Sequence, residues 1–222
     1  MSGKYVKWGA VGAFAYPILQ LISQGLIQFG GSEPAFTASA REILDFFQSK
    51  DVTLVTISGY ISVLSFIAFL WFLGALWREL RLAEGESGWV SIISVGSGFV
   101  AACGLLIVGG WGLAFFRIEE GLDAGIARML FDEGNLNFAN LWVSLGSMLL
   151  AAGVVFGGTD AAQGVSYPKW LVGGSIILGV GLILARAIWT SQIAFLPYVL
   201  FWAWMIAFGV YVLRNRARGD QK

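Results

Sequence analysis

The sequence predicts an all-α fold: a six-helix transmembrane bundle with two short amphipathic helices on its outer surface. Six long apolar runs take up most of the 222 residues, and the basic residues between them fall on alternating sides. Only 13% of the residues are charged, about half the usual share of roughly 25%. The chain therefore reads as a single integral membrane domain, residues 1–222. The six runs cover residues 8–29, 52–76, 89–116, 138–156, 170–189 and 193–213.

Each run is long enough to cross a hydrocarbon core of about 30 Å at about 1.5 Å per helical residue. Backbone groups in hydrocarbon must bond to one another, so only helices and closed barrels can span it. The runs lack the period-two alternation of barrel strands, which favours helices. The first run is longer than the apolar region of a secretory signal, so we expect it to remain as an uncleaved span.

The distribution of Lys and Arg predicts the orientation. With a cytoplasmic N-terminus, the inner side receives nine of the fourteen basic residues and the outer side receives five. Basic residues concentrate in short cytoplasmic loops, so we expect both termini in the cytoplasm. The inner set is Lys4, Lys7, Arg78, Arg81, Lys169, Arg214, Arg216, Arg218 and Lys222; the outer set is Arg41, Lys50, Arg117, Arg128 and Arg186.

Tryptophans mark the expected membrane boundaries. An indole ring is amphipathic and collects at the level of the lipid headgroups. Four tryptophans fall at predicted inner boundaries, and two fall near the outer boundary. The inner set is Trp8, Trp77, Trp89 and Trp170, and the outer pair is Trp142 and Trp189.

Two segments on the outer side carry helical signals. Ser39 can cap a helix over residues 40–49, and Glu42 three residues later completes a capping box. Ile43, Leu44 and Phe47 share one face of this segment. After Gly121, a second stripe contains Leu122, Ile126, Met129 and Leu130. Both segments are too short to span, so we expect them to lie on the outer membrane surface or to fold over the bundle.

Missing residue types exclude several functions. The chain has no histidine and a single cysteine, Cys103, so His-ligated metal or haem sites and a disulfide are not expected. No acidic residue lies near the middle of a run, where a proton-coupled transporter usually needs one. We therefore expect no cofactor, no metal and no nucleic-acid partner. The basic C-terminal tail is better suited to anionic lipid headgroups.

Polar side chains inside the runs are the candidate site. Gln20, Gln24 and Gln28 recur every four residues, which places them on one slowly rotating face of the first helix. We expect this face to point into the bundle, either as hydrogen-bonding contacts between helices or as the lining of a cavity open to the outer side. For Gln28, which is near the outer interface, solvation is an alternative. Arg186 either extends to outer headgroups or pairs with an outer acid such as Glu119 or Glu120. The candidate cavity residues are Gln20, Gln24, Gln28, Ser58, Tyr60, Ser62, Asn140, Ser144 and Arg186.

Two stretches carry a resemblance to known proteins. They are SAREIL at residues 39–44 and FLGALWRELRLAEG at residues 72–85, at the end of the second run. With them, the chain resembles a class of bacterial six-span membrane proteins known only as a domain of unknown function. The resemblance implies a bacterial inner-membrane setting and a compact helical bundle. It implies no catalytic residue.

Three hypotheses of function remain. The first is a non-enzymatic membrane protein that binds lipid or another hydrophobic ligand, or that serves as an accessory subunit; its partners would be membrane lipids, a second copy of itself or a membrane complex. The second is a transporter or channel for a small neutral solute through the Gln- and Ser-lined cavity. The third is a lipid-modifying enzyme, whose base would come from interfacial acids: Glu79, Glu84, Glu119, Glu120 or Asp123.

Overall fold

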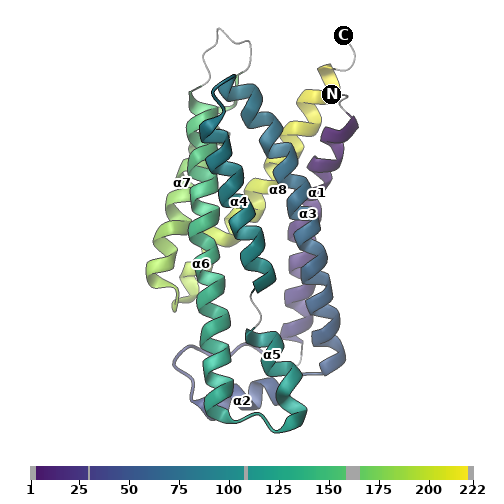
Figure 1. Ribbon diagram of the computed structural model, residues 1–222, viewed down its shortest axis with the longest axis vertical. Coiled ribbons are helices and arrows are strands. Elements are labelled where there is room, and N and C mark those ends of the chain that lie inside the picture. Colours follow the sequence, from purple (N-terminus) through teal and green to yellow (C-terminus); the bar gives the residue numbers. More distant parts are fainter. Residues whose placement is uncertain (1–3, 30, 108–109, 159–165, 220–222) are drawn as a thin grey trace.

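All the secondary structure in the described part of the chain is helical. A computed structural model describes residues 4–29, 31–107, 110–158 and 166–219. The long helices run along the long axis of the molecule, and α1 begins at the same end at which α8 finishes (Figure 1). We call this end the terminal end and the opposite one the α2 end. The α-helices are α1 (Lys4–Gln28), α2 (Ala40–Gln48), α3 (Val52–Glu84), α4 (Trp89–Ile107), α5 (Gly110–Arg117), α6 (Ala124–Gly157), α7 (Lys169–Ala185) and α8 (Leu196–Gly219).

Five of the helices are long and apolar enough to cross a membrane. They correspond to five of the six predicted runs: Lys7–Gln28, Val52–Glu84, Ala124–Gly157, Lys169–Ile188 and Gln192–Asn215. The third predicted run is different, because it does not form one helix over residues 89–116. The apolar helix α4 ends at Ile107, and α5 is a separate helix at the α2 end. Residues 108 and 109, between the two, lie outside the described part.

Local capping explains where several helices begin. The Ser39 side chain accepts the Glu42 amide hydrogen while the Glu42 carboxylate accepts the Ser39 amide hydrogen at 2.6 Å, so the predicted capping box starts α2. Asp51 accepts the amide hydrogens of Thr53 and Leu54 at the start of α3. Asp123 does the same at the start of α6. These carboxylates satisfy amide groups that a helix cannot pair internally.

The second predicted surface helix is not a separate element. Its residues form the first turns of α6, which continues for 34 residues. The predicted apolar stripe is correct for Leu122 and Leu130, which pack against a buried cluster, and wrong for Ile126 and Met129, which are exposed. The fully buried positions on this stretch are Ala127 and Phe131. Gly134 follows Phe131 by about one turn of α6. A Cβ at this position would lie 2.6 Å from the Trp111 ring of α5, so α5 approaches this face of α6 closely. The stripe is displaced because α5 packs against this face of α6.

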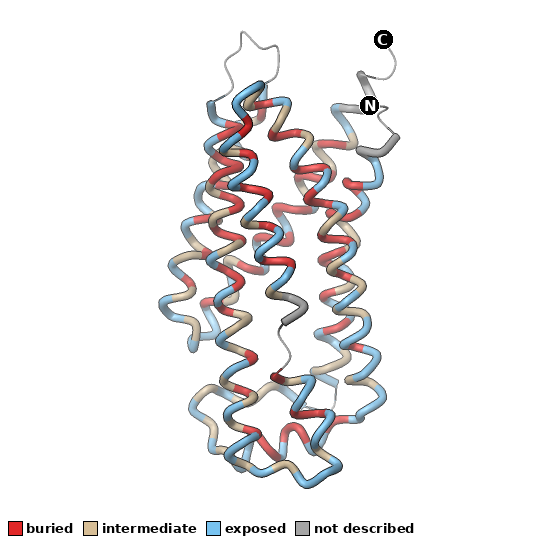
Figure 2. Tube along the Cα trace, viewed as in Figure 1, coloured by how far each residue is buried: buried red, intermediate tan, exposed pale blue. Residues whose placement is uncertain are grey.

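Two hydrophobic cores hold the described residues together. The larger core lies among α1, α3, α4, α6, α7 and α8. The smaller core lies at the α2 end, where α2 and α5 close over the start of α6; its fully buried side chains include Ile43, Phe47 and Phe131. Figure 2 shows buried positions concentrated along the inner sides of the long helices.

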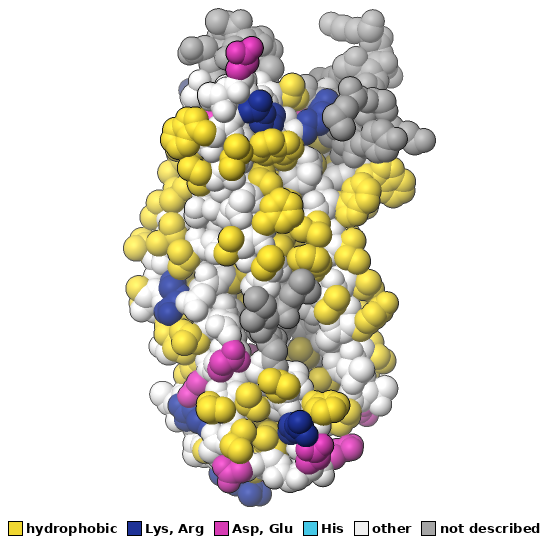
Figure 3. Space-filling view, in the orientation of Figure 1, with side chains coloured by type: hydrophobic (Ala, Val, Ile, Leu, Met, Phe, Trp, Pro, Cys, Tyr) yellow, Lys and Arg dark blue, Asp and Glu magenta, His cyan; other side chains and the backbone are white. Residues whose placement is uncertain are grey.

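The surface is apolar along the middle of the molecule. On the face drawn in Figure 3, hydrophobic side chains cover the central part, and most Lys, Arg, Asp and Glu side chains gather towards the two ends. Helices of 33 and 34 residues extend for about 50 Å, well beyond a hydrocarbon core of about 30 Å. In a bilayer, part of α3 and α6 would therefore project past the lipid.

Candidate functional site

The polar face predicted on α1 makes direct contact with α3. The Gln20 side-chain amide donates to the Ser65 hydroxyl at 2.7 Å. One step along the interface, the Ser58 hydroxyl donates to the Ser23 carbonyl at 2.8 Å, and the Ser23 hydroxyl donates to the Ser58 carbonyl at 3.1 Å. All four residues are buried. Their hydrogen-bonding groups are thus used between the two helices.

The rest of the predicted glutamine face lies outside this contact. Gln24 and Gln28 are exposed, and so is Tyr60 on α3. A spacing of four residues rotates by about 40° per step along a helix, whereas the contact with α3 follows the three-residue step from Gln20 to Ser23. The expectation of an inward position is therefore wrong for Gln24, whereas Gln28 is exposed, which was the alternative for this residue near the outer interface.

The remaining predicted hydroxyls lie on several helix pairs. Ser62 is half-buried on α3, and its carbonyl accepts the Ser65 hydroxyl at 2.6 Å. Ser144 is half-buried on α6. Three residues further, the Ser147 hydroxyl lies 2.9 Å from that of Ser97 on α4. The candidate cavity residues are thus distributed over different interfaces.

Arg186 and Asn140, both predicted site residues, are brought together. The Arg186 Nε donates to Asn140 Oδ1 at 2.7 Å, and the guanidinium lies 5.9 Å from the Trp189 ring centre. The suggested pairing of Arg186 with Glu119 or Glu120 is not found, because Glu120 pairs with Arg117 at 2.5 Å. Arg117 is three residues away on the same segment, so this pairing needs no long-range contact.

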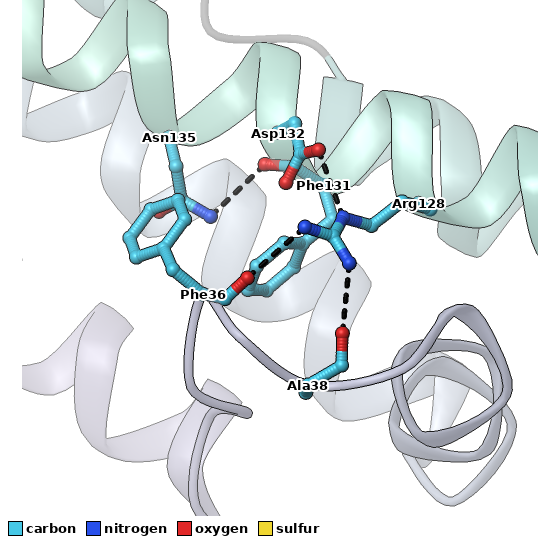
Figure 4. Close-up of polar contacts among 6 residues, drawn as sticks. All are labelled: Phe36, Ala38, Arg128, Phe131, Asp132 and Asn135. Atoms are coloured by element: carbon cyan, nitrogen blue, oxygen red, sulfur yellow. Dashed lines mark hydrogen bonds and ion pairs between the residues drawn. The ribbon is translucent and has the colours of Figure 1, made fainter. Parts of the chain in front are cut away.

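A cluster at the α2 end escaped the sequence analysis. It fixes the segment 31–39, which joins the end of α1 to α2 and which we call the strap. Arg128 donates to the carbonyls of Ala38 and Phe36 at 2.8 and 3.0 Å and pairs with Asp132 at 2.8 Å (Figure 4). The Arg128–Asp132 spacing of four residues was the only sequence signal; the two carbonyls are 90 and 92 residues away.

Aromatic contacts add to the attachment of the strap. The Phe36 ring lies 5.7 Å from that of Phe131 on α6 and 4.6 Å from that of Trp189 beyond α7. The Asn135 amide donates to the Phe131 carbonyl at 2.9 Å. The strap therefore connects α1 and α2 to the α6–α7 side of the bundle.

Two acidic side chains near the strap sit in unfavourable surroundings. Partial burial raises the pKa of Glu33 to about 7, and the neighbouring Asn135 side chain offsets part of this rise. Asp132 Oδ1 is buried and has no hydrogen-bond partner among the described residues. Across the described part of the chain, no group of three or more His, Cys, Asp or Glu residues could hold a metal ion.

Acids at the terminal end are built into helix contacts. Glu79 is fully buried on α3; it pairs with Arg78 at 3.0 Å, and its carbonyl accepts the Tyr167 hydroxyl at 2.9 Å. Glu84 accepts the amide hydrogens of Val90 and Ser91 at 3.0 and 2.7 Å, which caps the start of α4. The sequence had suggested interfacial positions for both Glu79 and Glu84, as candidate bases of an enzyme.

The arrangement thus contains interhelical polar pairs, one strap cluster and capping carboxylates. No protein-family model matches the chain, and neither a curated protein nor a solved structure matches it.

Proposed function

We propose that the protein is a non-enzymatic integral membrane protein of the bacterial inner membrane, with both termini in the cytoplasm. In this proposal it acts by binding lipid or another hydrophobic ligand. Five helices of spanning length and an apolar middle surface support a membrane setting. In this proposal the shorter apolar helix α4 is the sixth crossing, which termini on one side of the membrane require. The resemblance to bacterial six-span proteins and the excess of basic residues at the terminal end support the compartment and the orientation.

The observation that carries the proposal is the pairing of polar side chains between α1 and α3. Gln20 bonds to Ser65, and Ser23 bonds to Ser58, in buried positions. Side chains that line a solute path need free donors and acceptors facing that path. The pairing therefore favours interhelical contacts, each worth about 0.6–2 kcal/mol, over a solute path.

A flux experiment tests this reading against the transporter alternative. We expect vesicles containing the protein to take up urea or glycerol no faster than empty vesicles. Gln20→Leu should lower the thermal stability, because the hydrogen bond from α1 to the Ser65 hydroxyl is lost, and should leave the flux unchanged. A flux above that of empty vesicles, abolished by Gln20→Leu, would instead favour a channel or transporter.

An accessory subunit is the second form of the proposal, and the surface of the α2 end favours it. Four large apolar side chains of α5 and α6 are exposed there: Leu113, Phe116, Ile126 and Met129. Exposed apolar side chains outside the lipid are typical of a protein-binding surface. A photo-crosslinker at Phe116 should capture one partner reproducibly in cells, whereas the same group at Glu86, on the opposite end, should not.

The enzyme alternative has less support. Of its proposed bases, Glu79 and Glu84 take part in the helix contacts described above, and Glu120 pairs with Arg117. Hydrolysis of an acyl lipid by the purified protein, lost on substitution of Glu119 or Asp123, would revive this alternative.

A further inference from the structure

The basic side chains at the two ends of the molecule are used differently. At the α2 end, every basic residue has a partner within the protein. Three form ion pairs: Arg41 with Asp45, Arg117 with Glu120, and Arg128 with Asp132. The other two donate hydrogen bonds, Lys50 to the Gly31 carbonyl and Arg186 to Asn140. Each of these cations therefore has a partner on the protein itself, although Arg41 and Arg117 are paired at the exposed surface.

At the terminal end, four basic side chains form no ion pair with any other described residue: Lys7, Arg81, Lys169 and Arg214. Lys7, Lys169 and Arg214 are exposed, and Arg81 is half-buried. Among the described residues, the acids of this end form no ion pair with them, and Asp160 and Asp220 lie outside the described part. Glu79 pairs with Arg78, Glu84 caps α4, and Glu86 alone is an exposed acid among the described residues there. The side chains of Lys4, Arg216 and Arg218, and Lys222 itself, lie outside the described residues.

Three of these four cations are associated with an exposed tryptophan, one of them by contact in space and two as its neighbour in the sequence. Lys7 precedes Trp8, Lys169 precedes Trp170, and the Arg81 guanidinium lies 5.7 Å from the Trp77 ring centre. The three indoles are 57%, 48% and 37% exposed, in the order Trp8, Trp170 and Trp77. A Cβ on Gly9 of α1 would lie 2.5 Å from Ala75 of α3, so these two positions face each other. Trp8 and Trp77 are one and two residues further towards the terminal end, so their backbones lie at about the same height along the long axis. We call these three pairs the Trp–basic collar.

The chemistry of the collar fits a lipid headgroup. An indole ring prefers the boundary between acyl chains and headgroups, with its apolar part towards the chains. A neighbouring ammonium or guanidinium group then lies at the level of the lipid phosphates, where it attracts anionic lipids. A zwitterionic lipid offers the same phosphate together with a competing cation.

We propose that the Trp–basic collar binds the headgroups of anionic phospholipids in the leaflet at the terminal end. The inference rests on the membrane setting of the proposed function and specifies the class of lipid. Each collar cation should contribute a preference of about fivefold for an anionic over a zwitterionic headgroup, which corresponds to about 1 kcal/mol.

The test compares brominated lipids in vesicles that contain the full-length protein. Brominated phosphatidylglycerol should quench the tryptophan fluorescence more strongly than brominated phosphatidylcholine at equal mole fraction. The triple variant Lys7→Gln, Arg81→Gln, Lys169→Gln should lose most of this preference. The matched control Arg41→Gln, Arg117→Gln removes two cations at the α2 end and should keep it. Raising the salt concentration should weaken the preference, since charges near the surface are screened.

Three results would overturn the inference: equal quenching by both lipids in the wild type, an equal loss in both variants, or displacement by inorganic phosphate, which would indicate a free-anion site. A flotation assay with the vesicles distinguishes these results from a failure of the proposed membrane setting. A protein that does not float with the vesicles is not bound to the bilayer, so its lipid preference cannot be measured. If the triple variant does not insert, the single variant Lys169→Gln must lower the preference for the inference to stand.

Discussion

At the scale of single residues, Glu33 is a described carboxyl group whose pKa lies near neutrality. Its pKa is raised from 4.5 to about 7 because the strap partly removes the carboxylate from water. The folded protein therefore holds this proton between pH 4.5 and 7, whereas the unfolded chain releases it. Stability must fall as the pH rises through this window.

We predict that Glu33→Gln removes this part of the decline. The melting temperature of the wild type should drop between pH 5 and pH 8 by more than that of the variant. Glu42 provides a control of opposite sign, because hydrogen bonds from Ser39 lower its pKa; its contribution is present above pH 4.5 and is lost as the pH falls through the lowered value. A Glu33→Gln protein with the wild-type pH profile would contradict the prediction.

At the scale of helices, the closest approach between α1 and α3 depends on a missing side chain. A Cβ at Gly12 would lie 2.4 Å from the Ala68 carbonyl oxygen and 2.8 Å from the Phe72 nitrogen, both backbone atoms. Small residues of this kind let membrane helices pack closely. The helices cannot keep their separation if this position acquires a methyl group.

We predict that Gly12→Ala destabilises the protein by about 1–3 kcal/mol, the usual cost of overpacking. Gly25 on the same helix is the matched control, because its Cβ would meet nothing within 4 Å. Gly25→Ala should leave stability unchanged or raise it by up to about 1 kcal/mol through helix propensity. Unfolding in detergent measures the stability of both variants. Similar changes in the two would show that the close α1–α3 contact at Gly12 does not determine the stability.

The start of α2 gives a second prediction for an element. Ser39→Ala removes both the acceptor for the Glu42 amide and the hydroxyl that donates to the Glu42 carboxylate at 2.9 Å. The expected cost is about 1 kcal/mol, with faster amide exchange in the first turn of α2. Thr37→Ala, at an exposed strap position outside the capping box, should leave the exchange rates of α2 unchanged. Equal exchange in both variants would contradict the role of the cap.

For the whole molecule, the two ends differ in construction. The terminal end has exposed tryptophans and cations, whereas the α2 end is a small folded unit with its own core and internally paired charges. The difference matches the asymmetry that the positive-inside rule produces. The proposed orientation therefore places the folded unit on the outer side.

Cysteine labelling checks this orientation. In a Cys103→Ser background, Thr37→Cys should react with a membrane-impermeant maleimide in intact bacterial cells. Ser87→Cys, in the turn between α3 and α4 at the terminal end, should react only after the membrane is permeabilised. Both positions are exposed in the folded protein, so access to the reagent depends on the side of the membrane. The reverse pattern would invert the orientation, and labelling of both in intact cells would contradict the proposed topology.

Features that depend on local sequence were predicted successfully. The Ser39–Glu42 capping box and the buried stripe of Ile43, Leu44 and Phe47 involve residues within one or two turns, so spacing alone identifies them. The helical class follows from the long apolar runs, because hydrocarbon leaves the backbone few alternatives. Asp51 and Asp123 cap α3 and α6 by the same local rule, because each carboxylate accepts amide hydrogens two and three residues further along the chain.

Features that depend on long-range packing were not predictable. Hydropathy could not separate α4 from α5, because α5 is also apolar, although for a different reason: it covers the small core at the α2 end. Helical spacing proposed three inward glutamines, but only the position of α3 selected Gln20 and left Gln24 exposed.

By itself, the sequence determined that the chain forms long apolar helices, where the capped helix α2 begins, and how charge is divided between the two ends. Only the tertiary structure decided which polar side chains are consumed in contacts between helices, which cations stay unpaired, and that Arg128 holds the strap. The physical reason is range: burial and hydrogen bonding within a helix follow from neighbours in the chain, whereas a partner 90 residues away is chosen only when the helices pack.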